Sequence, residues 1–278
     1  MAAPLITRTN VISSASAAQT FTMKNPFVLE ICVESVESAI AAEAGGAHRI
    51  ELCADLGGGG TTPSAGLMQS VREYVHLPIH VMIRPRPGDF CYSNHELEIM
   101  RNDIQVAKQF HMDGVVLGIL REDARVDVER TKMLVEYAHP LPVTFHRAFD
   151  LANPETALED VIETGSTRIL TSGGEARATD ALSILRHLVD TAKGRILIMP
   201  CGGIDSANIA RIVRATTARE IHTSVGTSNP RPSNNGNSMP DGKDEPRSPA
   251  QSVVFEQNVT ELVNLLANIS PDEVVRGE

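Results

Sequence analysis

Leu29-Glu30-Ile31-Cys32 and Ile50-Glu51-Leu52-Cys53 are two short segments that share one pattern, in which an apolar residue alternates with Glu or Cys. An alternation of period two is typical of a β-strand whose two faces meet different surroundings. Each segment leads through a turn into an amphipathic helical pattern. Two such units in succession predict neighbouring strands of a parallel sheet.

The same strand–helix unit repeats along the chain from Phe27 onward. Helical patterns follow the strands, for example over Val36–Ala44 and Glu96–Phe110, and Phe255–Ala267 supplies the last helix. We expect eight strands, at Phe27–Cys32, Arg49–Cys53, Ile79–Arg84, Gly114–Leu117, Val143–His146, Arg168–Thr171, Ile196–Met199 and Glu220–His222. This order predicts an α/β protein, a single (β/α)8 TIM barrel with a parallel eight-stranded sheet. An open doubly wound sheet is the alternative, but no GxGxxG loop follows the first strand.

Composition limits the classes of partner. The chain has 278 residues, of which 42% are hydrophobic, enough for a sizeable core. A formal net charge of −10 argues against nucleic acid or an anionic membrane as the main partner, because both bind clustered Lys and Arg. No apolar run reaches the length of a membrane span. Four cysteines without a CxxC pair suit a reducing compartment, so we expect a cytoplasmic protein.

Two segments are expected to lie outside the barrel. Residues 1–24 are rich in Ser, Thr and Ala, and Arg8 and Lys24 are their only basic residues, which predicts a disordered tail rather than an Arg-rich transit peptide. Residues 227–252 are dense in Asn, Ser, Pro, Gly and charge, which predicts a disordered insertion after the eighth strand. The barrel domain would then span residues 25–278.

Polar side chains gather at the expected carboxyl ends of the strands, where such barrels keep their active sites. Alternation along the strands turns Glu30 and Cys32 toward the barrel axis, together with Glu51 and Cys53. Buried carboxylates are costly unless they are paired, so we expect an arginine beside each glutamate. The candidates are Arg84, Arg86 and Arg147. Further residues at this end are Met82, Thr144, His146, Asp150 and His222.

These charged residues allow two interpretations. One is a structural ion network that closes the barrel mouth, in which case the protein is a scaffold. The other is a binding pocket, which the convergence of the whole set favours. In an enzyme, a carboxylate or His146 would serve as general acid or base and the arginines would bind a small anionic or phosphorylated metabolite. The catalytic residues would then be Glu30, Glu51, Arg84, His146 and Arg147.

The cysteines suggest a different chemistry. Neighbouring strands lie about 4.8 Å apart, so Cys32 and Cys53 could share one ion. Two thiolates suit Cu(I) better than Mg²⁺ or Ca²⁺, and zinc normally requires four ligands. Cys201, after the seventh strand, is a candidate third ligand, whereas Cys91 lies in a loop. The alternative is that each cysteine is simply a small buried hydrophobic residue.

Two glycine-containing loops predict an anion site. Ser172 and Gly173 follow the sixth strand, and Gly202 and Gly203 follow the seventh. Barrels often bind phosphate through loops at this end of the late strands. Glycine pairs are also common in ordinary turns.

Several longer motifs resemble one known family, the CutC copper-homeostasis proteins. The matching motifs lie, in order, at residues 30–39, 45–53, 59–64, 81–86, 88–90, 142–150 and 170–173. The resemblance implies a barrel, a cytoplasmic homo-oligomer (dimer or tetramer) and a role in copper tolerance or trafficking. It also implies that Cys32 and Cys53 fall on the candidate Cu(I) ligands of eukaryotic members. The chain departs from the family at Cys201, which interrupts a glycine-rich run, and at the insertion over residues 227–252.

The sequence therefore predicts a cytoplasmic copper-homeostasis protein that binds Cu(I) through Cys32 and Cys53. An enzyme acting on a small anionic or phosphorylated metabolite is the alternative function.

Overall fold

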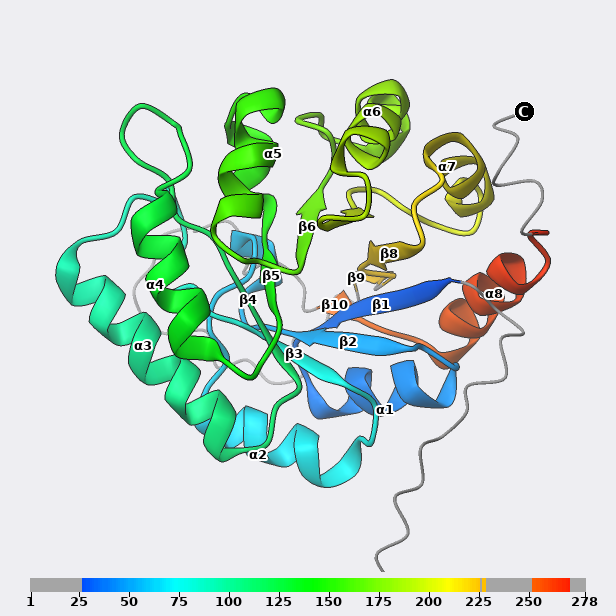
Figure 1. Ribbon diagram of the computed structural model, residues 1–278. Coiled ribbons are helices and arrows are strands. Elements are labelled where there is room, and N and C mark those ends of the chain that lie inside the picture. The colour runs from blue at the N-terminus through cyan, green and yellow to red at the C-terminus, as the bar shows by residue number, and fades with distance from the viewer. Residues whose placement is uncertain (1–26, 226, 229–251, 271–278) are drawn as a thin grey trace, which may run out of the picture.

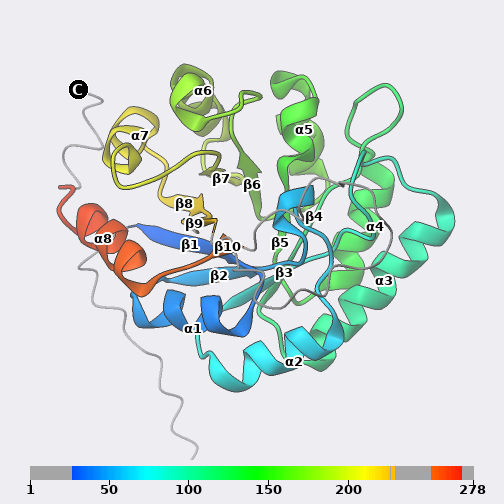
Figure 2. The same cartoon turned by 180° about the vertical axis from the view of Figure 1, so that it is seen from behind.

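The computed structural model describes residues 27–225, 227–228 and 252–270. Its parallel sheet has eight strands in the order β7-β6-β5-β4-β3-β2-β1-β8, with the helices packed around the outside (Figures 1 and 2). The strands are β1 (Val28–Val33), β2 (Arg49–Leu52), β3 (Ile79–Met82), β4 (Gly114–Leu117), β5 (Val143–Phe145), β6 (Arg168–Thr171), β7 (Leu197–Pro200) and β8 (Glu220–Thr223). The predicted TIM barrel is confirmed, and the strand limits differ from the expected ones by no more than two residues.

The strand register sets which side chains meet inside the barrel. Glu30 lies opposite Arg49 on β2 and opposite His222 on β8, while Cys32 lies opposite Glu51. Hydrogen-bonded pairing links each strand to the next around the ring. The exception is β7 and β8, which lie side by side without such a pairing among the described residues.

The helices follow the predicted apolar periodicity. They are α1 (Val36–Ala44), α2 (Ala65–Tyr74), α3 (Asn94–Gln109), α4 (Val128–Ala138), α5 (Pro154–Glu163), α6 (Leu182–Ala192), α7 (Ile209–Thr216) and α8 (Glu256–Ala267), with short 3₁₀ turns at Leu56–Gly58, Arg147–Leu151 and Ala178–Asp180. Ser93 and Glu96 form a reciprocal capping box at the start of α3. The buried face of α3 consists of Leu97, Met100, Ile104 and Ala107.

The ends of the expected insertion differ from the prediction. Thr227–Ser228 (β9) and Ser252–Val253 (β10) form a short antiparallel pair beside the end of β8. Residues 229–251 and the expected tail over residues 1–24 lie outside the described residues. Among the described helices, none is long and apolar enough to cross a membrane.

A glycine at the end of α1 allows close contact with α8. A Cβ added at Gly45 would lie 2.5 Å from the Cβ of Val259 and 2.7 Å from the carbonyl oxygen of Glu256. Gly45→Ala is therefore expected to lower the free energy of unfolding by about 1–3 kcal/mol, measured by urea denaturation. Gly66→Ala is the control, because its Cβ would meet only Ser64 Oγ, at 3.9 Å. Equal stability of the Gly45 variant and the wild type would refute this packing argument.

Candidate functional site

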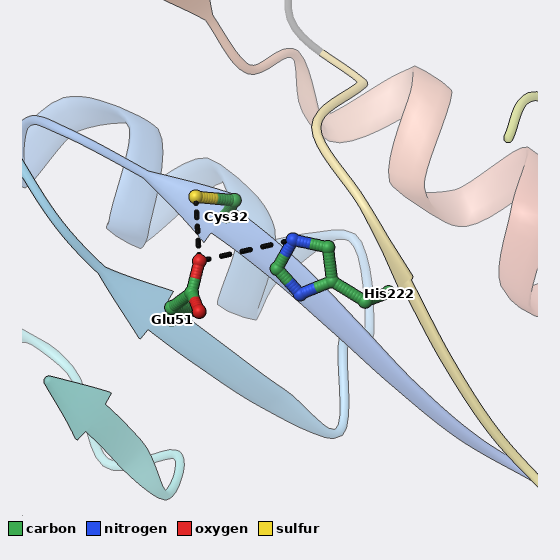
Figure 3. A group of neighbouring side chains, drawn as sticks. All are labelled: Cys32, Glu51 and His222. Atoms are coloured by element: carbon green, nitrogen blue, oxygen red, sulfur yellow. Dashed lines mark hydrogen bonds and ion pairs between the residues drawn. The ribbon is translucent and has the colours of Figure 1, made fainter. Parts of the chain in front are cut away.

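A thiol–carboxylate cluster, defined as Cys32, Cys53, Glu51 and His222, lies at the carboxyl ends of β1, β2 and β8. Figure 3 shows three of its members, Cys32, Glu51 and His222. The Sγ atoms of Cys32 and Cys53 are 3.5 Å apart. Cys32 also donates a hydrogen bond to Oε2 of Glu51, over 3.1 Å, and the same oxygen lies 3.8 Å from Nε2 of His222. All four residues are buried. The predicted inward orientation therefore brings the two thiols together.

The surroundings of the thiols are apolar and rich in sulfur. Met82 and Val116 pack with Cys32 and Cys53 in one buried group. The hydrogen bond with Cys53, followed by burial, raises the pKa of Cys32 well above its usual value. Cys32 is therefore a protonated thiol at neutral pH, which agrees with its role as donor to Glu51.

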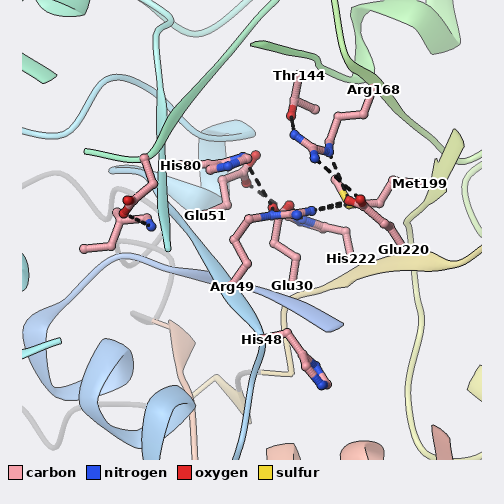
Figure 4. Close-up of polar contacts among 12 residues, drawn as sticks. Glu30, His48, Arg49, Glu51, His80, Thr144, Arg168, Met199, Glu220 and His222 are labelled. Carbon is pink, nitrogen blue, oxygen red and sulfur yellow. Dashed lines mark hydrogen bonds and ion pairs between the residues drawn. The ribbon is translucent and has the colours of Figure 1, made fainter. Parts of the chain in front are cut away.

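A buried ion network lies deeper in the barrel, next to the cluster (Figure 4). We define it as Glu30, Arg49, Arg168 and Glu220. Arg49 contacts Glu30 through Nε and donates to Glu220 through a terminal nitrogen, over 2.6 Å. Arg168 Nε lies 3.0 Å from the same oxygen of Glu220. His222 joins the network to the cluster, because its Nδ1 lies 2.7 Å from Oε1 of Glu30.

Burial and neighbouring charges have opposite effects on the pKa values of Glu30 and His222. Burial alone would raise the pKa of Glu30, but Arg49 and His222 hold that pKa well below its usual value. Burial alone would lower the pKa of His222, but the carboxylates of Glu51 and Glu30 raise it. Burial lowers the pKa of His80, on β3, to about 3. The balance therefore favours an ionised Glu30 beside a protonated His222, with His80 neutral.

The expected pairing of Glu30 and Glu51 with arginines from the loops is wrong. The partners of Glu30 are Arg49 and His222, and the hydrogen-bond partner of Glu51 is Cys32. The physical reason is the register, which places these residues directly opposite one another across neighbouring strands. Arginines in the loops would have to reach down into the barrel to contact Glu30 or Glu51.

The three loop arginines have other partners. Arg84 donates to the carbonyl oxygens of Gly58, Gly60 and Gly88. Arg86 pairs with Asp89 in its own loop and with Glu96 in the first turn of α3. Arg147 pairs with Asp150 and donates to Ser172. These contacts stabilise the loops at the barrel mouth.

His146 is buried beyond the end of β5. Its Nδ1 accepts a hydrogen bond from the backbone N–H of Ala148, so the neutral ring carries its proton on Nε2, an atom without a hydrogen-bond partner. Burial, together with the charge of Arg84, lowers the pKa of His146 to about 3. The side chain is therefore a neutral donor, separate from the thiol–carboxylate cluster.

The loop after β6 already holds an anionic group. Asp150 accepts hydrogen bonds from the backbone N–H groups of Ser172 and Gly174 and from the hydroxyls of Thr171 and Ser172. The expected anion site at Ser172, Gly173, Gly202 and Gly203 stays a prediction. An external anion in this loop would have to compete with the carboxylate of Asp150. Gly202 and Gly203 both have positive φ angles, as their turn requires.

The other two cysteines do not join the thiol pair. Cys201 is buried with Leu170 and Met199 in a separate apolar group, so it is not placed as the expected third ligand. Cys91 is partly exposed in the loop before α3.

Sequence reasoning missed four buried polar residues of the barrel interior. They are Arg49, His80, Arg168 and Glu220. The signal was available, since Arg49 has the same strand parity as Glu51, and His80 the same as Met82. The prediction used that parity only at the carboxyl ends of the strands.

Fold and site together define a parallel (β/α)8 barrel with a buried thiol–carboxylate–imidazole group at its carboxyl end. The model of the CutC family matches residues 27–227, and the chain belongs to this family. The predicted resemblance is confirmed.

Relatives that are named as copper homeostasis proteins are similar to this chain. The copper homeostasis protein cutC homolog of Mus musculus is 51% identical over 205 residues, covering 73% of this chain and 75% of the relative. The Homo sapiens homolog is 50% identical over 202 residues, with 72% and 74% covered. A solved structure named as a CutC copper homeostasis protein of Streptococcus agalactiae aligns with a TM-score of 0.68 at 33% identity, covering 71% of this chain and 98% of that one.

Proposed function

We propose that this CutC-family protein binds Cu(I) through Cys32 and Cys53 as part of copper homeostasis. The observation that carries the proposal is the separation of the two Sγ atoms, 3.5 Å, inside a buried group that also contains the thioether of Met82. Soft sulfur donors at low coordination number favour Cu(I) over hard divalent cations.

The neighbouring residues suit a site that must exchange a proton for a metal. Cys32 has to lose its proton to bind copper, and Glu51 Oε2 already accepts the hydrogen bond of that thiol. The other oxygen of Glu51 has no hydrogen-bond partner. Glu30 holds the ring of His222 through Nδ1 and leaves Nε2 facing Glu51. Three of these groups, Cys32, Glu51 and His222, lie close enough together to hold one ion.

The test is a titration of the reduced protein with Cu(I) against a competing chelator. We expect stoichiometric binding that Cys32→Ser with Cys53→Ser abolishes and that Met82→Leu weakens. Apparent affinity should rise with pH, because the raised pKa of Cys32 makes metal and proton compete.

Cys201→Ser is the matched control, since Cys201 is also buried but lies in a separate group. Unchanged affinity and stoichiometry in the double serine variant would refute the proposal.

Cellular context is part of the same proposal. We place the protein in the cytoplasm, as a homo-oligomer, either a dimer or a tetramer. A reducing compartment keeps Cys32 and Cys53 available as thiols. Cell fractionation and light scattering coupled to size-exclusion chromatography test the two statements.

The second candidate function is an enzyme acting on a small anionic metabolite. It is favoured by two buried atoms without hydrogen-bond partners, Oε1 of Glu51 and Nε2 of His146, which can offer an acceptor and a donor to a substrate. Arg84, Arg147 and Glu30 remain its proposed supporting residues. Turnover of a metabolite that is abolished by Glu51→Gln, with Cu(I) binding retained, would identify this activity.

A further inference from the structure

Arg84 carries a buried charge without a counter-ion. Its side chain follows β3 and is only 4% exposed, yet among the described residues no carboxylate forms an ion pair with it. Its two terminal nitrogens donate to backbone carbonyls, and its guanidinium lies 4.8 Å from the ring centre of Phe90. The remaining donor, Nε, has no partner. A buried cation normally has an anionic partner.

Two further donors without partners lie close to Arg84. The Tyr92 hydroxyl and Nε2 of His146 are buried and have no hydrogen-bond acceptor, and the guanidinium of Arg84 lies on the donor side of the hydroxyl. Burial raises the pKa of Tyr92 to about 12, against the opposing effect of Arg84, so the hydroxyl keeps its proton. The ring of Phe90 contacts His146 as well, with ring centres 4.8 Å apart. Arg84 and His146 therefore both contact the ring of Phe90, and Tyr92 lies beside Arg84.

The three groups share one chemical character. Each offers a donor, one of them carries a positive charge, and none of the three atoms has an acceptor. Buried groups of this kind are rare unless an ordered water or a ligand binds them, because each costs about 1–3 kcal/mol when left unpaired. We infer that Arg84, Tyr92 and His146 form a binding site for the oxyanion group, carboxylate or phosphate, of a small molecule.

Space for such a molecule adjoins the site. Tyr92 lines a cavity of about 650 Å³ between the loops that follow β3 and β4, whereas Arg84 and His146 lie outside its lining. This volume is within the usual range for small-molecule sites. Arg121, Arg125 and Arg130 also line the cavity, which adds positive charge, although acidic residues alternate with them.

The site goes beyond copper binding and would supply the anion-binding part of the second candidate function. It shares a loop with the thiols but no residue. Gly60 gives its carbonyl oxygen to Arg84, and a Cβ at Gly60 would lie 3.6 Å from the Cβ of Cys53. Binding of an anion can therefore be tested separately from binding of copper.

The experiment is calorimetric titration of the reduced full-length protein with inorganic phosphate and, separately, with succinate. We expect at least one of them to bind, and Tyr92→Phe to weaken that binding about tenfold, the usual effect of losing one hydrogen bond to a charged group. His146→Asn should act similarly, because its amide oxygen can still accept from Ala148 while the Nε2 donor is lost.

Tyr92→Phe removes a hydroxyl without a protein acceptor, so the fold and the Cu(I) affinity should stay unchanged. Tyr74→Phe, at a 61% exposed position, is the matched control and should bind like the wild type. Preference for phosphate or for succinate identifies the class of ligand. The inference is overturned if neither probe binds, or if binding is the same in the wild type, Tyr92→Phe and His146→Asn.

Discussion

Arg49→Leu is expected to lower the free energy of unfolding by about 3–5 kcal/mol. Arg49 bridges Glu30 and Glu220 inside the barrel, and Glu30 is completely buried. The substitution leaves Glu30 with His222 as its remaining close partner, whereas Glu220 keeps Arg168. Most of the loss therefore comes from a carboxylate buried without its main counter-ion. Equilibrium urea denaturation at neutral pH measures the change.

Two further variants separate this cause from loss of packing. Adding Glu30→Gln to Arg49→Leu should recover part of the stability, because the double variant no longer buries the uncompensated charge. Arg195→Leu removes an exposed arginine that forms a two-bonded pair with Glu159, and it should change stability far less. Equal effects at positions 49 and 195 would contradict the argument.

Acid is expected to destabilise the fold already at pH values well above those at which carboxylates usually titrate. Burial lowers the pKa of His80 and of His146 to about 3, whereas an unfolded histidine titrates near pH 6.5. Both groups have depressed pKa values in the folded state, so their contribution is present above about pH 6.5 and is lost as pH falls toward 3. Each contributes a slope of about 1.4 kcal/mol per pH unit.

Other groups modify this slope. Glu30, with a lowered pKa, adds to the loss only below about pH 4.5. Glu51, whose pKa burial raises, works in the opposite direction. His80→Gln should therefore flatten the pH dependence between about pH 6 and pH 4 by one proton. His76→Gln, at an exposed site, is the control. The same slope in all three proteins would show that His80 is not a buried neutral group.

The fold could be predicted from the sequence because local signals agreed with each other. Alternation marked the strands, and Val36–Ala44 was predicted with the limits that α1 has. The differences lie at strand ends. The strand expected over Ile79–Arg84 ends at Met82, because Arg84 turns out to the loop carbonyls rather than continuing the sheet.

The site could be predicted only in part. Parity along each strand placed Cys32 and Cys53 on the inside, since that depends on one strand alone. The pairing of residues across neighbouring strands depends on the register between those strands, and no local sequence pattern encodes that register. Cys32 consequently lies level with Glu51, and Glu30 with Arg49. The unpaired donors of Tyr92 and His146 depend on loop geometry, which the sequence does not reveal.

The carboxylate of Asp150 acts as an intramolecular ligand of the loop that follows β6. It lies on the turn after β5 and occupies the backbone N–H groups that follow β6, so its effective concentration there far exceeds that of any dissolved metabolite. A free phosphate can enter this loop only if the turn that carries Asp150 moves away. An external anion would therefore meet less competition at the unpaired donors of Arg84, Tyr92 and His146.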